Sequence, residues 1–326
     1  MTVLGRPLGT ALGLFADRYL GEPPLDPHPV AAFGSLLAAL EQTTYDDDRA
    51  AGVVHAGLGV GAGVAAGSLL HSPAIATYLA VAGRALGDAA LEVAEALALD
   101  DLARARTLLP SLVGRDPSRL DEHEIVRAVV ESVAENTTDA VVAPAFWAVV
   151  AGAPGALGYR AVNTLDSMVG HHSPRYEHFG WASARADDAA SWIPARVTAA
   201  LVMLARPRRA RAIWQIVQED APGHPSPNAG VAEAAFAAAL GVRLGGINTY
   251  GDRVEVRARL GRGRDAEAGD IAAAVRLLAD VQLLLALVLL GAGALESLAG
   301  LVRLAGRARR RTRGPIRGAR AAATGR

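Results

Sequence analysis

The sequence predicts an all-α fold: a polytopic helical membrane protein whose polar site loops face the cytoplasm. Apolar residues make up 51% of the chain and charged residues only 20%, whereas an ordinary soluble domain carries roughly 25% charged residues. The apolar residues gather in long runs without a formal charge, and about 20 such residues cross a bilayer. No segment is predicted to be a strand, because polar–apolar alternation does not persist. A soluble protein with buried core helices is the alternative.

Three uncharged runs define the candidate membrane segments: residues 50–83, 140–159 and 281–295. The first is long enough for one span and the start of a second, with a break at HSP, residues 71–73. Inside it, GLGVGAG at 57–63 resembles a glycine-rich loop, but close helix packing in a membrane explains these glycines better.

The segments between these runs predict further helices and the end of the domain. Residues 84–135 read as amphipathic helices, and PSPNAGVAEAAFAAALG at 225–241 as a capped helix closed by a glycine. We predict one membrane-embedded catalytic domain over residues 1–305. Residues 306–326 are predicted to be an arginine-rich, disordered tail, which the positive-inside rule places in the cytoplasm.

Missing residue types exclude several chemistries. The chain has no cysteine and no lysine, so its 33 basic residues are all arginine. Disulfides, thiolate metal sites, cysteine nucleophiles, Schiff bases and a lysine-bearing phosphate loop are therefore excluded, and anions are expected to be bound by Arg. The net charge is zero, which gives no indication of nucleic-acid binding.

Three clusters of polar residues lie beside apolar sequence, where unpaired charge is costly. In ESVAENTTD, the spacing of Glu131, Glu135 and Asp139 places three carboxylates on one helix face, next to an asparagine. NTLDSM holds two more polar groups one turn apart, and SARADDAASWIPAR holds an acidic pair. The last two clusters comprise Asn163, Asp166, Asp187 and Asp188.

Oxygen ligands of this kind suit Mg²⁺, which takes one or two carboxylates together with waters and substrate phosphates. Arginines in and around the clusters would hold phosphate or carboxylate oxygens. These are Arg160, Arg175, Arg185 and Arg196. The histidines at 171, 172 and 178 do not have the spacing of a zinc helix. The clusters therefore predict phosphoryl chemistry at a membrane face.

The run 140–159 decides whether these clusters can meet. As a straight helix it would extend about 30 Å and put Asp139 and Asp166 on opposite sides of the membrane. Pro144 and the GAPG sequence at 152–155 disfavour a continuous helix. We therefore expect a buried hairpin whose ends both face the cytoplasm, with the two carboxylates within about 12 Å of each other.

The residues alone leave two classes of function open. One is a Mg²⁺-dependent membrane enzyme acting on a phosphorylated substrate, of which an intramembrane prenyltransferase is one form. The other is a transporter whose paired intramembrane charges line a pathway. The density of Asn, Asp, Arg and Tyr over residues 159–196 favours an enzyme.

A series of motifs resembles a known family. DRYLGEPPLDPHPVAAFG, VGRDPSRL, VESVAENTTDAVVAPAFW, YRAVNTLDSMVGHHSPRY, SARADDAASWIPAR and HPSPNAGVAEAAFAAALGVRLGG occur in the order found in the CobD/CbiB family of cobalamin biosynthesis proteins, the adenosylcobinamide-phosphate synthases. The resemblance runs from about Asp17 to about Ile271, and NTLDSMVG is its most specific part. Arg160 replaces an expected lysine, the histidines at 171 and 172 an expected Tyr-Lys pair, and Ser191 an asparagine.

The resemblance implies an integral membrane enzyme. It would join a propionate carboxylate of adenosylcobyric acid to aminopropanol, or to its O-phosphate, by an amide bond, with ATP as co-substrate and Mg²⁺ as cofactor. The expected partners are these small molecules, the lipid bilayer, and either other cobalamin-pathway enzymes or further copies of the chain. The expected location is the cytoplasmic membrane, with the active site and C-terminus on the cytoplasmic side.

The resemblance identifies the motifs, and the chemistry of amide formation suggests roles for individual residues within them. The pool of Mg²⁺ ligands or bases is Glu135, Asp139, Asp166, Asp187 and Asp188, and Asn136 and Asn163 would orient a ligand or a substrate amide. The phosphate or propionate clamps would be Arg160, Arg175, Arg185 and Arg196. Tyr176, Ser226 and Asn228 are further expected substrate contacts, with His28 at the edge of the site.

Overall fold

The computed structural model describes residues 5–312, except 27, 115, 172 and 251–252. Its first half contains α1 (Arg6–Leu20), α2 (Pro29–Thr44), α3 (Arg49–Leu70), α4 (Pro73–Ala80), α5 (Gly83–Ala98), α6 (Leu102–Leu108), η1 (Leu109–Ser111), α7 (Glu122–Thr137), η2 (Thr138–Val142), α8 (Ala143–Ala151) and α9 (Ala153–Leu165). The second half contains η3 (Asp166–Gly170), α10 (Trp181–Ala205), η4 (Pro207–Arg209), α11 (Ala210–Asp220), η5 (Ala221–Gly223), α12 (Ala229–Leu240), β1 (Val242–Tyr250), β2 (Arg253–Leu260), β3 (Arg264–Asp265) and α13 (Ala268–Thr312).

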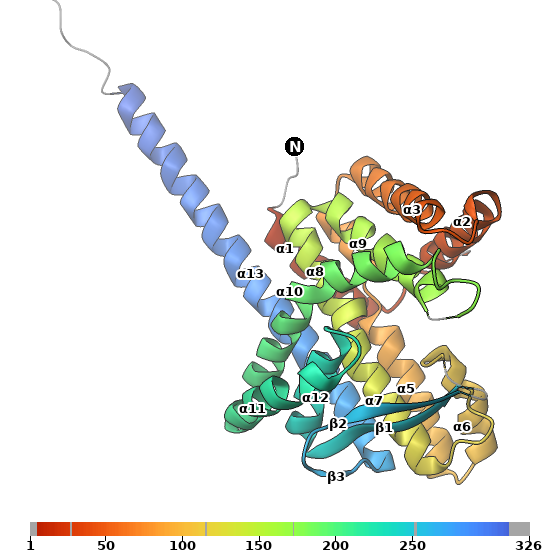
Figure 1. The fold of residues 1–326 in the computed structure, drawn as a ribbon. Coiled ribbons are helices and arrows are strands. Elements are labelled where there is room, and N and C mark those ends of the chain that lie inside the picture. Colours follow the sequence, from red (N-terminus) through yellow and green to blue (C-terminus); the bar gives the residue numbers. More distant parts are fainter. Residues whose placement is uncertain (1–4, 27, 115, 172, 251–252, 313–326) are drawn as a thin grey trace, which may run out of the picture.

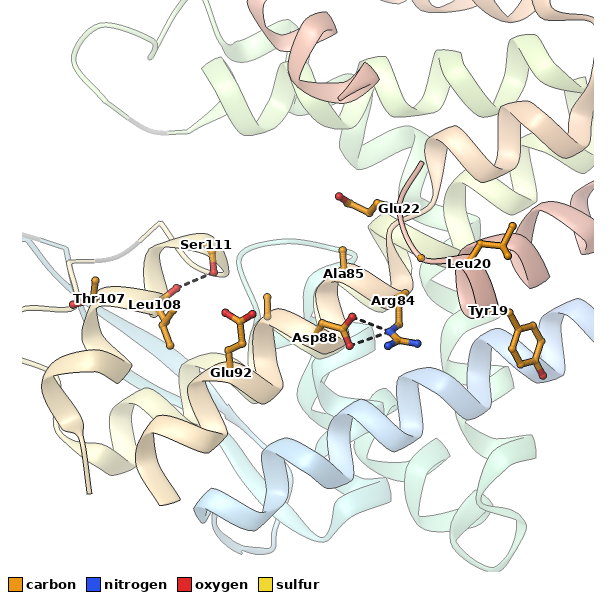
Figure 2. A pocket seen from close by; sticks show the side chains of 12 residues that line it. Tyr19, Leu20, Glu22, Arg84, Ala85, Asp88, Glu92, Thr107, Leu108 and Ser111 are labelled. Carbon is orange, nitrogen blue, oxygen red and sulfur yellow. Dashed lines mark hydrogen bonds and ion pairs between the residues drawn. The ribbon is translucent and has the colours of Figure 1, made fainter. Parts of the chain in front are cut away.

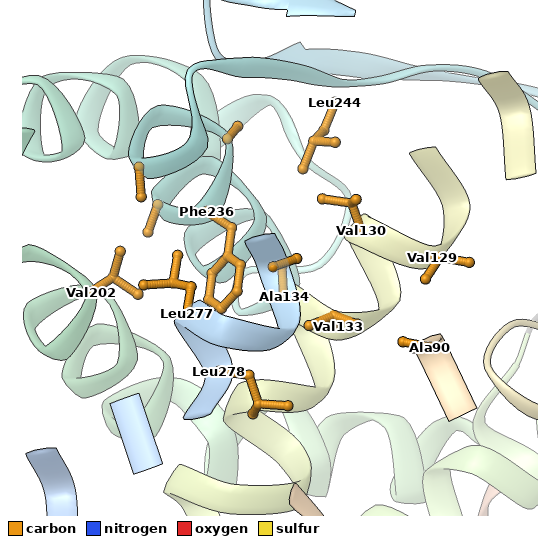
Figure 3. Packing of buried hydrophobic residues seen from close by; sticks show 14 of the residues in the cluster. Ala90, Val129, Val130, Val133, Ala134, Val202, Phe236, Leu244, Leu277 and Leu278 are labelled. Carbon is orange, nitrogen blue, oxygen red and sulfur yellow. The ribbon is translucent and has the colours of Figure 1, made fainter. Parts of the chain in front are cut away.

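The elements form two groups along one axis (Figure 1). Helices α1, α2, α3, α8 and α9 lie at one end, and α5, α6, α7, α11, α12 and the sheet lie at the other. Helix α10 reaches from the first group towards the second, and α13 extends away from the body as a long rod. The core of the second group is apolar: Val133, Val202, Phe236, Leu244 and Leu277 are all fully buried against one another (Figure 3).

Three helical segments are long and apolar enough to cross a membrane: Arg49–Leu70, Pro73–Ala98 and Ala268–Ala299. The second combines α4 and α5 and is broken at Val81–Ala82. Helix α13 continues past residue 305 to Thr312, so the start of the segment predicted to be a disordered tail is helical. Residues 313–326, the rest of that tail, lie outside the described residues.

Glycines let α3 pack closely on α9, as expected for GLGVGAG. A Cβ at Gly59 would lie 3.0 Å from a methyl of Leu165, and one at Gly63 would lie 2.7 Å from the Leu157 carbonyl oxygen, both in α9. Gly57 and Gly61, on the other face, have nothing near them. Close backbone approach through small residues is a common way for membrane helices to associate.

The predicted hairpin over residues 140–159 is present. Helix α8 ends at Ala151 and α9 starts at Ala153, and the φ of 74° at Gly152 between them suits glycine. At the open end of the hairpin, the Tyr159 hydroxyl donates to Asp139 Oδ1 at 3.3 Å. The two ends of the run therefore lie side by side, and a continuous span is excluded.

Irregular helices inside this group are completed by their neighbours. Two π-helical turns, η2 and η3, interrupt the helices at Asp139 and Asp166. The Ala82 amide, at the break between α4 and α5, donates to the Ala140 carbonyl of η2 at 3.0 Å. Because π turns are rare and often occur at functional sites, their position at both acids draws attention to these residues.

A buried polar network holds the start of α5. Asp17 of α1 accepts a hydrogen bond from the Arg84 amide at 3.2 Å and another from Gln282 of α13 at 2.7 Å. Asp17 and Gln282 are almost fully buried. The carboxylate of one helix thus caps the exposed amides of a second and binds a third.

The expectation of an all-α fold is wrong for residues 242–250, 253–260 and 264–265, which form a three-stranded sheet in the order β2-β1-β3. Strands β1 and β2 are antiparallel, and β3 pairs in parallel with β1. The sequence of β2, RVEVRARL, does alternate charged and apolar residues. The double glycine of β1 obscured the pattern, because it marks a β-bulge between Leu244 and Gly246.

Candidate functional site

The three polar clusters meet in one cavity of about 880 Å³. Its walls come from the segment after η1, from α7, η2, η3 and α10, from α12 and the segment before it, and from β2. The acidic residues that line it are Glu131, Glu135, Asp139, Asp166, Asp187, Asp188 and Glu233. The arrangement is possible because the α8–α9 hairpin returns the chain, which brings Asp139 and Asp166 to the same place.

Asp139 lies in the π turn η2, half-buried beside the acids of the other clusters. Burial raises its pKa well above the usual range, and the charges of Asp187 and Glu135 raise it further. The hydrogen bond from Tyr159 opposes this rise, and the Tyr159 hydroxyl also hydrogen-bonds Ser191 at 2.9 Å. Asp139 is therefore fixed in position but poorly compensated in charge.

Asp166 lies at the start of the second π turn, η3. Burial and the charge of Asp188 raise its pKa to about 6. Its carboxylate lies directly over Gly170, where any Cβ would overlap Asp166 Oδ1. Glycine at position 170 therefore leaves the space that this carboxylate occupies.

Asp187 is the third poorly compensated acid. Burial and the charge of Asp166 raise its pKa to about 7, although a hydrogen bond from Asn163 opposes the rise. Its Oδ1 atom is buried and has no hydrogen-bond partner among the described residues. A buried carboxylate oxygen without a donor is costly, so this atom is available to a ligand.

The segment before α12 forms the opposite wall and carries two predicted residues, Ser226 and Asn228. Ser226 Oγ accepts hydrogen bonds from the amides of Asn228 and Ala229 and so caps the start of α12. Asn228 donates to the backbone carbonyl of Asp188 at 2.8 Å and accepts from Arg196 at 3.1 Å. Arg196 thus supports the wall through Asn228.

The other predicted clamps also lie outside the lining. Arg175 and Tyr176 bind Glu41 of α2, both at 2.9 Å, and the Arg175 guanidinium lies 3.9 Å from the centre of the Tyr45 ring. These contacts fasten the loop after η3 to the α2–α3 corner. Arg185 is exposed and lies 3.6 Å from Asp188.

Three further predicted residues have local roles. His28 caps α2 by accepting a hydrogen bond from the Val30 amide. Asn136 donates to Ser132 one turn earlier in α7. Arg160 lies outside the lining, yet its buried Nε has no hydrogen-bond partner in the described structure, and burial lowers its pKa.

The lining residues that were not predicted include three with ionisable side chains: His224, Glu233 and Arg257. His224 Nε2 lies 3.6 Å from a carboxylate oxygen of Glu233, and both side chains are almost fully buried. His224 Nδ1 accepts a hydrogen bond from the Ser226 amide at 3.1 Å, so it shapes the wall before α12. His224 and Glu233 belong to the HPSPNAGVAEAAF motif, which could have pointed to them, whereas Arg257 lies in the unpredicted strand.

A second hollow, of about 680 Å³, lies between the end of α1 and helices α5 and α6 (Figure 2). It is more open than the acid-lined cavity and contains none of the three clusters. Its most prominent polar contact is the ion pair of Arg84 with Asp88, which are one helical turn apart and both exposed. A pair of this kind contributes little to stability, and the hollow has no polar group that requires a ligand.

The fold and the cavity together define a class: a helical protein with segments that could cross a membrane and a shared pocket of acidic side chains between its two groups of helices. Residues 10–278 match the family described as CobD/Cbib protein. The chain belongs to that family, and its place is in cobalamin biosynthesis.

Curated relatives named "Cobalamin biosynthesis protein CobD" support this assignment. The protein of Mycobacterium tuberculosis (strain ATCC 25618 / H37Rv) is 47% identical over 85% of this chain and 92% of its own length. Those of Geobacter metallireducens and Halalkalibacterium halodurans are 46% and 40% identical, over 77% and 80% of this chain and 84% and 88% of their own lengths. No solved structure matches the chain.

Proposed function

We propose that the protein is an ATP- and Mg²⁺-dependent ligase that joins a propionate carboxylate of adenosylcobyric acid to aminopropanol or its O-phosphate. The observation that carries the proposal is the convergence of Asp139, Asp166 and Asp187 in one cavity, with raised pKa values and a buried, unpartnered oxygen. An amide forms from a carboxylate only after activation, most simply as an acyl phosphate. Such phosphoryl transfer depends on positioning and charge neutralisation.

The residues present fit a magnesium ion in part. Among the described residues, no group of three or more His, Asp or Glu side chains has the arrangement of a complete metal site. Mg²⁺ commonly takes one or two protein carboxylates and fills its other positions with water and substrate phosphates. The unpartnered Asp187 Oδ1 and the mutual repulsion of the acids fit such an ion.

The chain's own residues would divide the remaining work. Asp139, Asp166 and Asp187 would hold the ion, which when bound would neutralise phosphate charge, and the acids left over would accept the proton released by the attacking amine. Asn163 holds Asp187 by a hydrogen bond. Tyr159 and the α12 wall keep the acids in place. No covalent nucleophile is required, in agreement with the absence of cysteine and lysine.

The proposed location is the cytoplasmic membrane, with the cavity and the C-terminus on the cytoplasmic side, where ATP is found. The three apolar helical segments support a membrane location. The nine arginines after residue 302, with no acidic residue beyond Glu296, support a cytoplasmic C-terminus.

A product assay tests the proposal. Protein purified in detergent is incubated with adenosylcobyric acid, ATP, Mg²⁺ and either amine, and the corrinoid product is measured by mass spectrometry. We expect a cobinamide or its phosphate, formed with consumption of ATP and lost in EDTA. Consumption of a prenyl diphosphate instead, or substrate flux across sealed vesicles without a chemical change, would replace the ligase by a prenyltransferase or a transporter.

A further inference from the structure

Among the described residues that line the acid-lined cavity, one basic group has a permanent charge. Arg257 of β2 is the only arginine among the described residues that line it. The four arginines that the sequence suggested as clamps all lie outside the lining. The acids would repel a phosphorylated substrate in this cavity unless positive charges bound its phosphate. Arg257 is placed to supply one such charge.

A β-bulge sets the position of Arg257. The regular pairing of β1 with β2 is interrupted between Leu244 and Gly246, and Gly246 pairs with Arg257. Gly245 and Gly246 have φ angles of 74° and 104°, and a Cβ on Gly245 would overlap the Ala258 carbonyl. Bulges next to active sites commonly redirect a side chain. The residue that lies opposite the bulge on β2 is Arg257.

Two charged residues of α7 hold the bulge. Glu131 Oε1 accepts a hydrogen bond from the Gly245 amide at 2.8 Å, and Arg127 donates to the Gly245 carbonyl. Glu131 is almost fully buried, and hydrogen bonds to a buried charged group are among the stronger ones. Helix α7 also carries Glu135 and leads into the turn that holds Asp139. Arg257 is therefore fixed relative to the acids.

We propose that Arg257 is the phosphate-binding residue of the cavity and that the Gly245 bulge, held by Glu131 and Arg127, directs it there. Its planar guanidinium would bind two oxygens of a phosphate group. The inference rests on the proposed function and identifies the part of the site that binds the substrate anion. The phosphate comes either from the phosphorylated amine or from the terminal phosphate of ATP.

Steady-state kinetics of Arg257→Gln distinguish the two sources. If Arg257 binds the amine phosphate, the KM for aminopropanol O-phosphate rises at least 30-fold, while the KM values for aminopropanol and ATP stay within twofold. If it binds ATP, the KM for ATP rises with either amine. Arg257→Lys keeps the positive charge but loses the planar guanidinium that binds two oxygens, so its KM is expected to lie between those of the wild type and Arg257→Gln. Arg259→Gln, an exposed arginine on the same strand, is the matched control and should behave as wild type.

A binding measurement separates this inference from the proposed function. Calorimetric titration of the detergent-solubilised protein with aminopropanol O-phosphate, and separately with a non-hydrolysable ATP analogue in Mg²⁺, should show an affinity at least 30-fold weaker in Arg257→Gln for one of the two ligands. If this loss appears although the wild type makes no cobinamide product, the proposed function fails and the inference stands.

Two outcomes would overturn the inference. In one, the wild type makes the product and Arg257→Gln binds both ligands as the wild type does. In the other, Arg257→Gln and Arg257→Lys lower the melting temperature and reduce kcat with every substrate equally, without changing any KM. That pattern would mean that Arg257 only balances the acids of the cavity wall.

Discussion

Asp139, Asp166 and Asp187 bring more negative charge into a half-buried cavity than their hydrogen bonds compensate. The Asp166 carboxyl has a pKa of about 6 and that of Asp187 about 7, whereas an unperturbed Asp has a value of 3.8. Raised values mean that the folded protein disfavours the charged forms. Folding therefore maintains an electrostatic conflict here, and such conflicts concentrate at functional sites.

Replacing Asp166 by Asn should separate activity from stability. Asparagine keeps the size of the side chain but removes the charge, so turnover in the product assay should fall at least 100-fold. The melting temperature in EDTA should stay the same or rise, because a repulsion is removed. Asp100→Asn, at an exposed turn position with φ 56° that Asn also tolerates, is the control and should change neither. Wild-type turnover in Asp166→Asn would remove this residue from the site.

Gly170→Ala tests the space around the same carboxylate. The added methyl would overlap Asp166 Oδ1, so the carboxylate must move, and a displacement of about 1 Å can cost about 100-fold in rate. We expect a large loss of turnover with less than about 1 kcal/mol of destabilisation in thermal unfolding. In the Asp166→Asn background the same change should cost little further activity, because the two effects act through one group. Additive losses would contradict this coupling.

At the scale of elements, broken helices are completed by side chains and amides from other helices. Pro194 lies inside α10 and has no amide hydrogen, which leaves the Ala190 carbonyl without its helical donor. Trp147 of α8 donates to that carbonyl at 3.0 Å. Ala82 does the same for the Ala140 carbonyl in η2. The irregular backbone around the cavity therefore depends on the packing of the hairpin.

Trp147→Phe should destabilise the protein by about 1 kcal/mol, because a half-buried carbonyl loses its donor. Thermal unfolding in detergent measures the effect, with Trp214→Phe at an exposed position as the control. Restoring the backbone amide by Pro194→Ala should reduce the cost of Trp147→Phe in the double variant. If the cost were equal in both backgrounds, Trp147 would stabilise the protein by packing alone.

The hairpin and the meeting of the acids could be predicted from local sequence. Unpaired charges beside long apolar runs are costly, which predicts that the acids gather at one site. Pro144 and the glycines near residue 152 indicate the turn of the α8–α9 hairpin. The partner of Arg175 could not be predicted in this way. Glu41 lies 134 positions earlier, in a helix with no distinguishing pattern, so a structural contact resembled a phosphate clamp.

The β-hairpin was missed for a different reason. Strand β2 alternates clearly, but β1 contains two glycines, which are unfavourable in a strand unless a bulge requires them. The need for that bulge appears only once Glu131 and Arg127 of α7 are seen to bind Gly245. Arg257 therefore had no local signal as a cavity residue.

At the scale of the whole molecule, the outer faces of α3 and α13 are apolar and exposed, while the inner face of α3 packs on α9 and that of α13 packs on α1, α5 and α7. Val53, Leu58, Leu69, Val288 and Leu295 are each about half exposed or more, which suits contact with lipid. The residues that line the cavity come from other elements, including α7, η2, η3, α10, α12 and β2, and none of them belongs to α3 or α13. The chain thus combines a polar, acid-lined cavity with apolar outer faces on other helices.

The acids of the cavity should make the stability of the whole protein depend on pH and on Mg²⁺. Unfolding returns Asp166 and Asp187 from pKa values of about 6 and 7 to about 3.8, so the unfolded state binds fewer protons between pH 4 and 7. Their contribution to stability is therefore fully present below about pH 4 and is lost as the pH rises to about 7. In EDTA, the melting temperature should therefore fall from pH 5 to pH 7.5. The corresponding loss in the free energy of unfolding is on the order of a few kcal/mol.

Two comparisons identify the groups responsible for this slope. The Asp166→Asn, Asp187→Asn double variant should show a much flatter dependence over the same range, because the titrating carboxyls are gone. Adding Mg²⁺ should stabilise the wild type more at pH 7.5 than at pH 5, because the ion binds the ionised carboxylates and competes with protons, and it should have little effect on the double variant. Equal slopes in the wild type and the double variant would show that other groups set the pH dependence. Equal stabilisation of both by Mg²⁺ would place the ion outside the cavity.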